Sequence, residues 1–135
     1  MQTKCMKVTN ILLWVQENKE SERFYKRLGF DVTTSTDGYS EIQHSTFKIV
    51  LVNMRDEDEF AGDSLAGEKG RGMYVYIHVD DVDDHYAKLV DGGFTPHTVP
   101  RDWPWGNREF VLKDPDGYKL VFWHELTLMQ QKNAI

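Results

Sequence analysis

The sequence lacks disulfide partners, an excess of positive charge and a long hydrophobic run. Its single cysteine, Cys5, excludes an internal disulfide framework and is typical of a reducing cytosol. The formal net charge is −6, so the basic stripe of a general nucleic-acid binder is missing. The apolar run near the N-terminus is too short to span a bilayer and has no small-residue cleavage site. We therefore expect a cytoplasmic protein that binds neither nucleic acid nor a membrane.

The chain contains enough apolar material to build a core. It has 135 residues, of which 40% are hydrophobic and 13% are aromatic. Those values exclude a disordered chain and suit one compact domain, which we expect to span residues 1–135.

The first half of the sequence repeats in the second half. Residues 12–30 align with residues 76–94 at a constant offset of 64, which pairs Gly29 with Gly93 and Phe30 with Phe94. Each copy reads as a hydrophobic strand, a polar turn and a helix with one apolar side, and then Gly-Phe opens another strand. The glycines stand where a helix C-cap is expected.

The remainder of each half also matches once loop insertions are allowed. Residues 38–42 align with 106–110, and residues 47–53 align with 118–124. Each half is therefore predicted to be strand, helix, strand, strand, strand. We place module 1 at about residues 7–54, an acidic linker without periodicity at about 55–70, and module 2 at about 71–126.

This organisation predicts an α+β fold of two tandem βαβββ modules. One helix covers only one face of a four-stranded sheet, so the other face of each sheet is left open. We expect the modules to form a curved mixed sheet around a cavity, which is where a small ligand would bind. The turn DPDG (114–117) leads into the last strand of module 2, with Val121 at its centre.

Two stretches carry a family resemblance. The segments ESERFYKRLGF (20–30) and REFVLKDPDGYKLVF (108–122), within paired βαβββ modules, resemble the vicinal oxygen chelate superfamily. That group contains glyoxalase I, extradiol dioxygenases, fosfomycin-resistance enzymes and bleomycin-resistance proteins. The most specific stretch, PWGNREFVLKDPDGY (104–118), is similar to the bleomycin-resistance branch. This resemblance implies a homodimer with two equivalent ligand pockets.

The resemblance also locates the positions at which superfamily enzymes hold a divalent metal. One ligand comes from the first strand and one from the last strand of each module, which here are Asn10, Val50, Tyr74 and Val121. Valine cannot ligate a metal, and Asn and Tyr are poor ligands without His or carboxylate partners. We therefore expect neither a metal nor another cofactor.

Strand alternation extends the candidate ligand-binding surface. Residues of the same parity as the four metal positions face the same side of their strands. The loop at 100–107 adds Trp103 and Trp105, which are braced by Pro100 and Pro104. This surface favours flat hydrophobic ligands by stacking and cations by cation–π attraction. The same strand aromatics could instead form a core, and the loop tryptophans could form a dimer contact. The predicted ligand-binding residues are Asn10, Leu12, Trp14, Val50, Val52, Tyr74, Tyr76, His78, Trp103, Trp105, Val121 and Trp123.

Three functions remain open from the sequence. The first is a metal-free protein that sequesters a planar or cationic hydrophobic compound, such as an antibiotic. The second is a lyase, isomerase or dioxygenase with non-standard site residues, either metal-dependent or metal-independent. Its candidate acid–base pair is His78 and Glu125, each four residues beyond a family metal position. The third is a scaffold whose cavity has collapsed and whose fold serves protein–protein contact.

Overall fold

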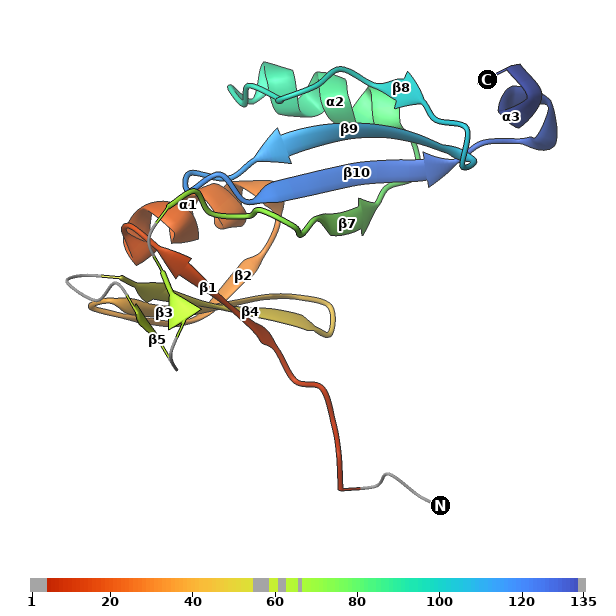
Figure 1. Ribbon diagram of the computed structural model, residues 1–135. Coiled ribbons are helices and arrows are strands. Elements are labelled where there is room, and N and C mark those ends of the chain that lie inside the picture. Colours follow the sequence, from red (N-terminus) through yellow and green to blue (C-terminus); the bar gives the residue numbers. More distant parts are fainter. Residues whose placement is uncertain (1–4, 55–58, 61–62, 66, 134–135) are drawn as a thin grey trace. The chain divides into compact units, whose positions relative to one another are not determined.

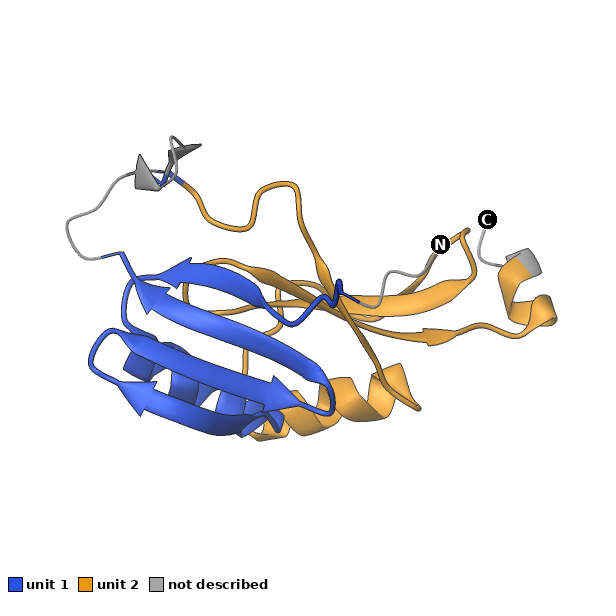
Figure 2. Ribbon diagram, turned by 90° about the horizontal axis from the view of Figure 1, so that it is seen from below, with its two compact units in different colours: residues 1–67 blue, residues 68–135 orange. Residues whose placement is uncertain are grey.

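The chain divides into two compact units, residues 1–67 and residues 68–135 (Figure 2). The computed structural model describes residues 5–54, 59–60, 63–65 and 67–133. Each unit contains a four-stranded sheet and a helix of ten or eleven residues (Figure 1). None of the helices in these described ranges is long and apolar enough to cross a membrane.

Unit 1 is built as strand, helix and three further strands. Its parallel pair is β1 with β4, and the other neighbours are antiparallel, giving the order β1-β4-β3-β2. Alternate strand residues such as Leu13, Ile49 and Leu51 are buried, and Tyr25 of the helix is fully buried. The elements are β1 (Ile11–Val15), α1 (Asn18–Leu28), β2 (Asp31–Thr36), β3 (Tyr39–His44) and β4 (Phe47–Asn53).

Unit 2 repeats this plan and adds a short C-terminal helix. Its sheet has the order β7-β10-β9-β8, again with the first and last strands of the module parallel. Its core contains Phe110 and Phe122, stacked 5.0 Å apart between ring centroids. The elements are β7 (Val75–His78), α2 (Val82–Asp91), β8 (Arg101–Asp102), β9 (Asn107–Lys113), β10 (Lys119–Glu125) and α3 (Leu128–Asn133). The predicted α+β fold with two βαβββ modules is confirmed.

The second strand of module 2 differs from the prediction. A strand was expected to open at Phe94, but β8 comprises only Arg101 and Asp102, inside the stretch predicted to be a loop. Pro96 and Pro100 have no backbone N–H to give to a ladder. The intervening amides of His97 and Thr98 both bond to the carbonyl oxygen of Val111, which is not a regular strand pattern.

The acidic segment between the modules also contains structure that the sequence did not predict. Strands β5 (Glu59–Phe60) and β6 (Asp63–Ser64) pair as a short antiparallel hairpin. The rest of the predicted linker, apart from 65 and 67–70, lies outside the described residues.

The N-termini of the two long helices are held in the same way by different side chains. In unit 1 the backbone N–H of Asn18 donates to Oδ1 of Asn53, at 2.6 Å. In unit 2 the backbone N–H of Val82 donates to Nδ1 of His124, at 2.9 Å. Asn53 and His124 occupy the same repeat position at the end of the module's last strand. Each side chain therefore satisfies a helix N–H that has no partner within the helix.

This equivalence predicts that asparagine can replace His124. The substitution His124→Ala leaves the N–H of Val82 without its acceptor, so we expect the free energy of unfolding to fall by about 1 kcal/mol. His124→Asn supplies the acceptor that unit 1 uses and should recover most of that loss. Urea unfolding of the three proteins measures the difference. Equal destabilisation by alanine and asparagine would contradict the capping role.

Candidate functional site

A pocket of about 500 Å³ lies on the face of the unit 2 sheet opposite its buried core. Strand alternation separates the two faces: Phe110, Leu120 and Phe122 pack on the core side, while their neighbours Val111 and Val121 line the pocket, where Val121 is itself buried. Its volume is in the range of small-molecule sites. The lining residues are Tyr74, Tyr76, Thr98, Val99, Arg101, Trp103, Trp105, Glu109, Val111 and Val121.

Three side chains stack in layers at this pocket. The rings of Trp103 and Trp105 are nearly parallel, 11° apart in orientation, with centroids separated by 4.6 Å. The guanidinium carbon of Arg101 lies 3.8 Å from the ring centroid of Trp103. Trp105 nevertheless remains 61% exposed. The loop between β8 and β9 therefore presents a rigid aromatic surface to solvent beside the pocket.

A buried carboxylate lies in the same pocket. Glu109 is only 6% exposed, and its Oε2 accepts hydrogen bonds from Nε1 of Trp105 at 3.0 Å and Nδ2 of Asn107 at 3.2 Å. Its Oε1 has the hydroxyl of Tyr76 at 3.5 Å. Burial, followed by the negative charge of Glu109, raises the pKa of Tyr76 above that of an ordinary tyrosine. The Tyr76 phenol is therefore protonated at neutral pH.

An arginine on the opposite face of β9 fixes the loop that carries the tryptophans. Arg108 donates to both carboxylate oxygens of Asp83, at 2.9 Å each, and to Asp102 at 2.8 Å. Asp83 belongs to the first turn of α2, and Asp102 immediately precedes Trp103. The guanidinium thus ties helix α2 and strand β8 to strand β9.

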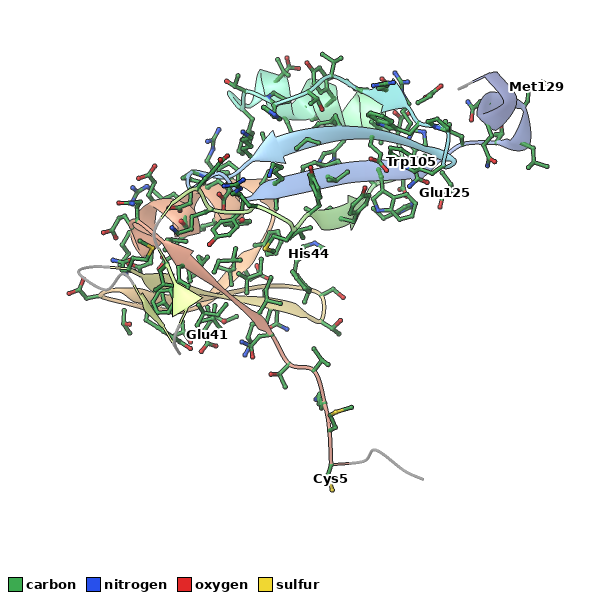
Figure 3. The ribbon with its side chains drawn as sticks, viewed as in Figure 1. Cys5, Glu41, His44, Trp105, Glu125 and Met129 are labelled. Atoms are coloured by element: carbon green, nitrogen blue, oxygen red, sulfur yellow. The ribbon has the colours of Figure 1, made fainter. Side chains whose placement is uncertain are left out.

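The structure brings together the two residues predicted as an acid–base pair. Nε2 of His78 lies 2.8 Å from Oε1 of Glu125, and the His78 ring packs edge-to-face on Trp123. The hydrogen bond with His78 lowers the pKa of Glu125. Glu125 pairs in register with Asn107, so it lies at the same end of the sheet as the loop of Trp105 (Figure 3).

The predicted ligand-binding residues separate into three groups. Five of them line the pocket, namely Tyr74, Tyr76, Trp103, Trp105 and Val121. His78 and Trp123 have the same strand parity but are not among the lining residues. The other five belong to unit 1: Asn10, Leu12, Trp14, Val50 and Val52. Asn10 and Tyr74 each stand one residue before their strand rather than within it.

Sequence reasoning missed five lining residues, of which Glu109 and Arg101 carry charge. For Glu109 a signal was present, because the DPDG turn sets the antiparallel register that places it opposite Trp123. For Arg101 no signal existed, since its position depends on the short strand β8. The missed residues are Thr98, Val99, Arg101, Glu109 and Val111.

The comparisons with known proteins define the family. The model of the Glyoxalase/Bleomycin resistance protein/Dioxygenase superfamily matches residues 7–122, and the chain belongs to this superfamily. No protein of curated function matches the sequence.

Solved structures share the fold at low sequence identity. A glyoxalase/bleomycin resistance protein/dioxygenase from Nocardioides has a TM-score of 0.76 and 22% identity, covering 91% of this chain and 86% of its own. A lactoylglutathione lyase from Agrobacterium tumefaciens has a TM-score of 0.69 and 13% identity, covering 87% and 92%. A virulence protein from Salmonella typhimurium has a TM-score of 0.67 and 20% identity, covering 90% and 98%. At these low sequence identities, the similarities show a shared fold and do not show a shared function.

The residues predicted to stand at the superfamily's metal positions do not fit a metal. Val50 and Val121 are buried and offer no donor atom, and Oδ1 of Asn10 accepts a hydrogen bond from the hydroxyl of Thr9. Among the described residues, no group of three or more His, Cys, Asp or Glu side chains is placed to hold a metal ion.

The Arg108 contacts predict how stability depends on pH. The hydrogen bond from Arg108 lowers the pKa of Asp83, so this carboxylate stabilises the fold above about pH 4, and the stabilisation is lost as pH falls through its folded pKa. Arg108→Met should lower the free energy of unfolding at pH 7 by about 1 kcal/mol and reduce the further loss on acidification.

Urea unfolding at pH 7 and pH 3 measures this effect. The matched control is Lys88→Met, which removes an exposed ion pair with Asp84 from the same helix and should change stability little. An Arg108 variant with the same pH dependence as the unsubstituted protein would contradict the assignment.

Proposed function

We propose that the unit 2 pocket binds a planar hydrophobic small molecule stoichiometrically and sequesters it without turnover. The stacked pair of Trp103 and Trp105 beside the pocket carries this proposal. A flat ring system gains both dispersion contact and removal of apolar surface from water when it lies against such a pair. Tyr74 and Tyr76, which are about half exposed, supply further aromatic surface from β7 and the residue before it.

Two further observations support binding over metal chemistry. The pocket volume of about 500 Å³ suits a drug-sized molecule. The four positions that the resemblance assigns to the metal ligands of superfamily enzymes carry Asn10, Val50, Tyr74 and Val121. The superfamily description itself covers resistance proteins as well as enzymes, so membership alone does not choose between them. An antibiotic as ligand, a homodimer and a cytoplasmic location belong to this proposal.

One observation favours a second candidate, a lyase, isomerase or dioxygenase that uses an acid–base pair. His78 and Glu125 are in contact at 2.8 Å, which is the geometry of a general base and the carboxylate that orients it. This candidate requires turnover that is lost in His78→Asn. Its metal-dependent form requires tight stoichiometric binding of Ni²⁺, Mn²⁺, Fe²⁺ or Zn²⁺ to chelator-treated protein in a calorimeter.

The stacking proposal predicts a large effect of Trp105. Acridine, a planar tricycle, should bind saturably at one site per chain in a calorimetric titration. Trp105→Ala removes one stacking surface together with a hydrogen bond to Glu109, so we expect its affinity to fall by about tenfold.

The control for this prediction is Phe47→Ala. Phe47 is an exposed aromatic residue of unit 1 and is not part of the unit 2 pocket, so acridine affinity should not change. Absence of saturable binding to the unsubstituted protein, or an equal loss in both variants, would overturn the proposed function.

A further inference from the structure

Glu109 is a buried carboxyl group whose hydrogen-bond partners carry no positive charge. It is 6% exposed, and its hydrogen-bond partners, Trp105, Asn107 and Tyr76, are all neutral. Among the described residues, no lysine, arginine or histidine forms an ion pair with it. Buried carboxylates are normally paired, because removing an ion from water is costly.

The two carboxylate oxygens of Glu109 are not equally satisfied. Oε2 accepts two hydrogen bonds of ordinary length, from Trp105 and Asn107. Oε1 has only the hydroxyl of Tyr76, at the long limit of 3.5 Å. An ionised carboxylate has about four acceptor sites, so Oε1 retains capacity for a strong donor. Since Glu109 lines the pocket, that donor can come from a bound molecule.

The neighbouring cation of the chain is engaged elsewhere. Arg101 pairs directly opposite Glu109 in the ladder between β8 and β9. Its guanidinium nevertheless stacks on Trp103 and makes no ion pair with Glu109 among the described residues. The carboxylate is therefore left for another positive group.

Comparison with module 1 shows that Glu109 lacks an ion pair that its repeat counterpart has. Glu41 occupies the position in module 1 that Glu109 occupies in module 2, and Nζ of Lys48 lies 3.3 Å from Oε1 of Glu41. The repeat counterpart of Lys48 is Lys119, which donates instead to the carbonyl oxygen of Gly70 and lies over the ring of Tyr74. Module 1 thus neutralises its carboxylate from within the chain, and module 2 does not.

We propose that the ligand of the unit 2 pocket carries a protonated nitrogen whose N–H donates to Oε1 of Glu109 while its planar part stacks on the tryptophans. This inference rests on the proposed function and adds the class of ligand, a planar aromatic cation with N–H donors such as an aromatic amidine or an aminoacridinium. Such a bond is charge-assisted and lies in a pocket wall shielded from water, where it is stronger than a bond between neutral groups.

The test compares two probes of the same shape. 9-Aminoacridine is a cation with N–H donors at pH 7.5, whereas acridine is neutral at that pH. Calorimetry should show 9-aminoacridine binding about tenfold or more tightly than acridine. Glu109→Gln should abolish this preference, because the loss of the charge weakens binding of 9-aminoacridine more than binding of acridine. Urea unfolding of Glu109→Gln checks that unit 2 remains folded. Glu109→Asp, which keeps the charge, should retain part of the preference.

The matched control is Glu41→Gln, which removes the repeat-equivalent carboxylate from unit 1 and should keep the full preference. Equal affinities of the two probes, a preference that survives in Glu109→Gln, or tighter binding of acridine-9-carboxylate would overturn the inference. The last result would assign Arg101 as the anchor of an anionic ligand. Failure of every probe to bind would instead overturn the proposed function on which the inference rests.

Discussion

A four-stranded sheet has two faces, and the one long helix of each module can cover only one of them. In unit 1 the covered face buries Leu13, Ile49 and Leu51. In unit 2 the covered face buries Phe110 and Phe122. The pocket lies on the face of the unit 2 sheet opposite this core.

Comparison of the two modules shows which features a duplicated fold retains and which it changes. The capping of the helix N-terminus is retained, although Asn53 performs it in one module and His124 in the other. The glutamate on the third strand is retained as Glu41 and Glu109. Its surroundings differ, because Glu41 has Lys48 beside it and Glu109 has indole and amide donors. The scaffold is therefore duplicated, while the chemistry of the open face is specific to each module.

The fold could be predicted from the sequence because its determinants are local. The strands and helices of each module were predicted from strand alternation, helix periodicity and glycines at helix ends. Gly29 and Gly93 adopt the positive φ values of 113° and 93° that favour glycine. The DPDG turn likewise fixes the register of β9 and β10 by itself. Strand β8 could not be predicted, because its placement depends on amides of His97 and Thr98 bonding to Val111, far along the chain.

The candidate site was predictable only in part for a related reason. Strand parity placed Tyr76 and Val121 on the pocket face, since alternation needs no tertiary information. The stacking of Arg101, Trp103 and Trp105 and the burial of Glu109 depend on the conformation of one loop. Arg108 holds that conformation through its hydrogen bond to Asp102, and no sequence pattern predicts this contact.

Ligand binding at the aromatic loop and Glu109 of unit 2 can be observed directly. The indole N–H groups report on it directly, because the chain has only four tryptophans and Nε1 of Trp105 donates to Glu109. The measurement is a ¹H–¹⁵N spectrum of the indoles, assigned by Trp→Phe substitutions, recorded during titration with 9-aminoacridine. Binding at this loop should shift the Trp105 and Trp103 resonances most, and the two should saturate together. Shifts confined to Trp14 of unit 1, or no shifts at all, would contradict it.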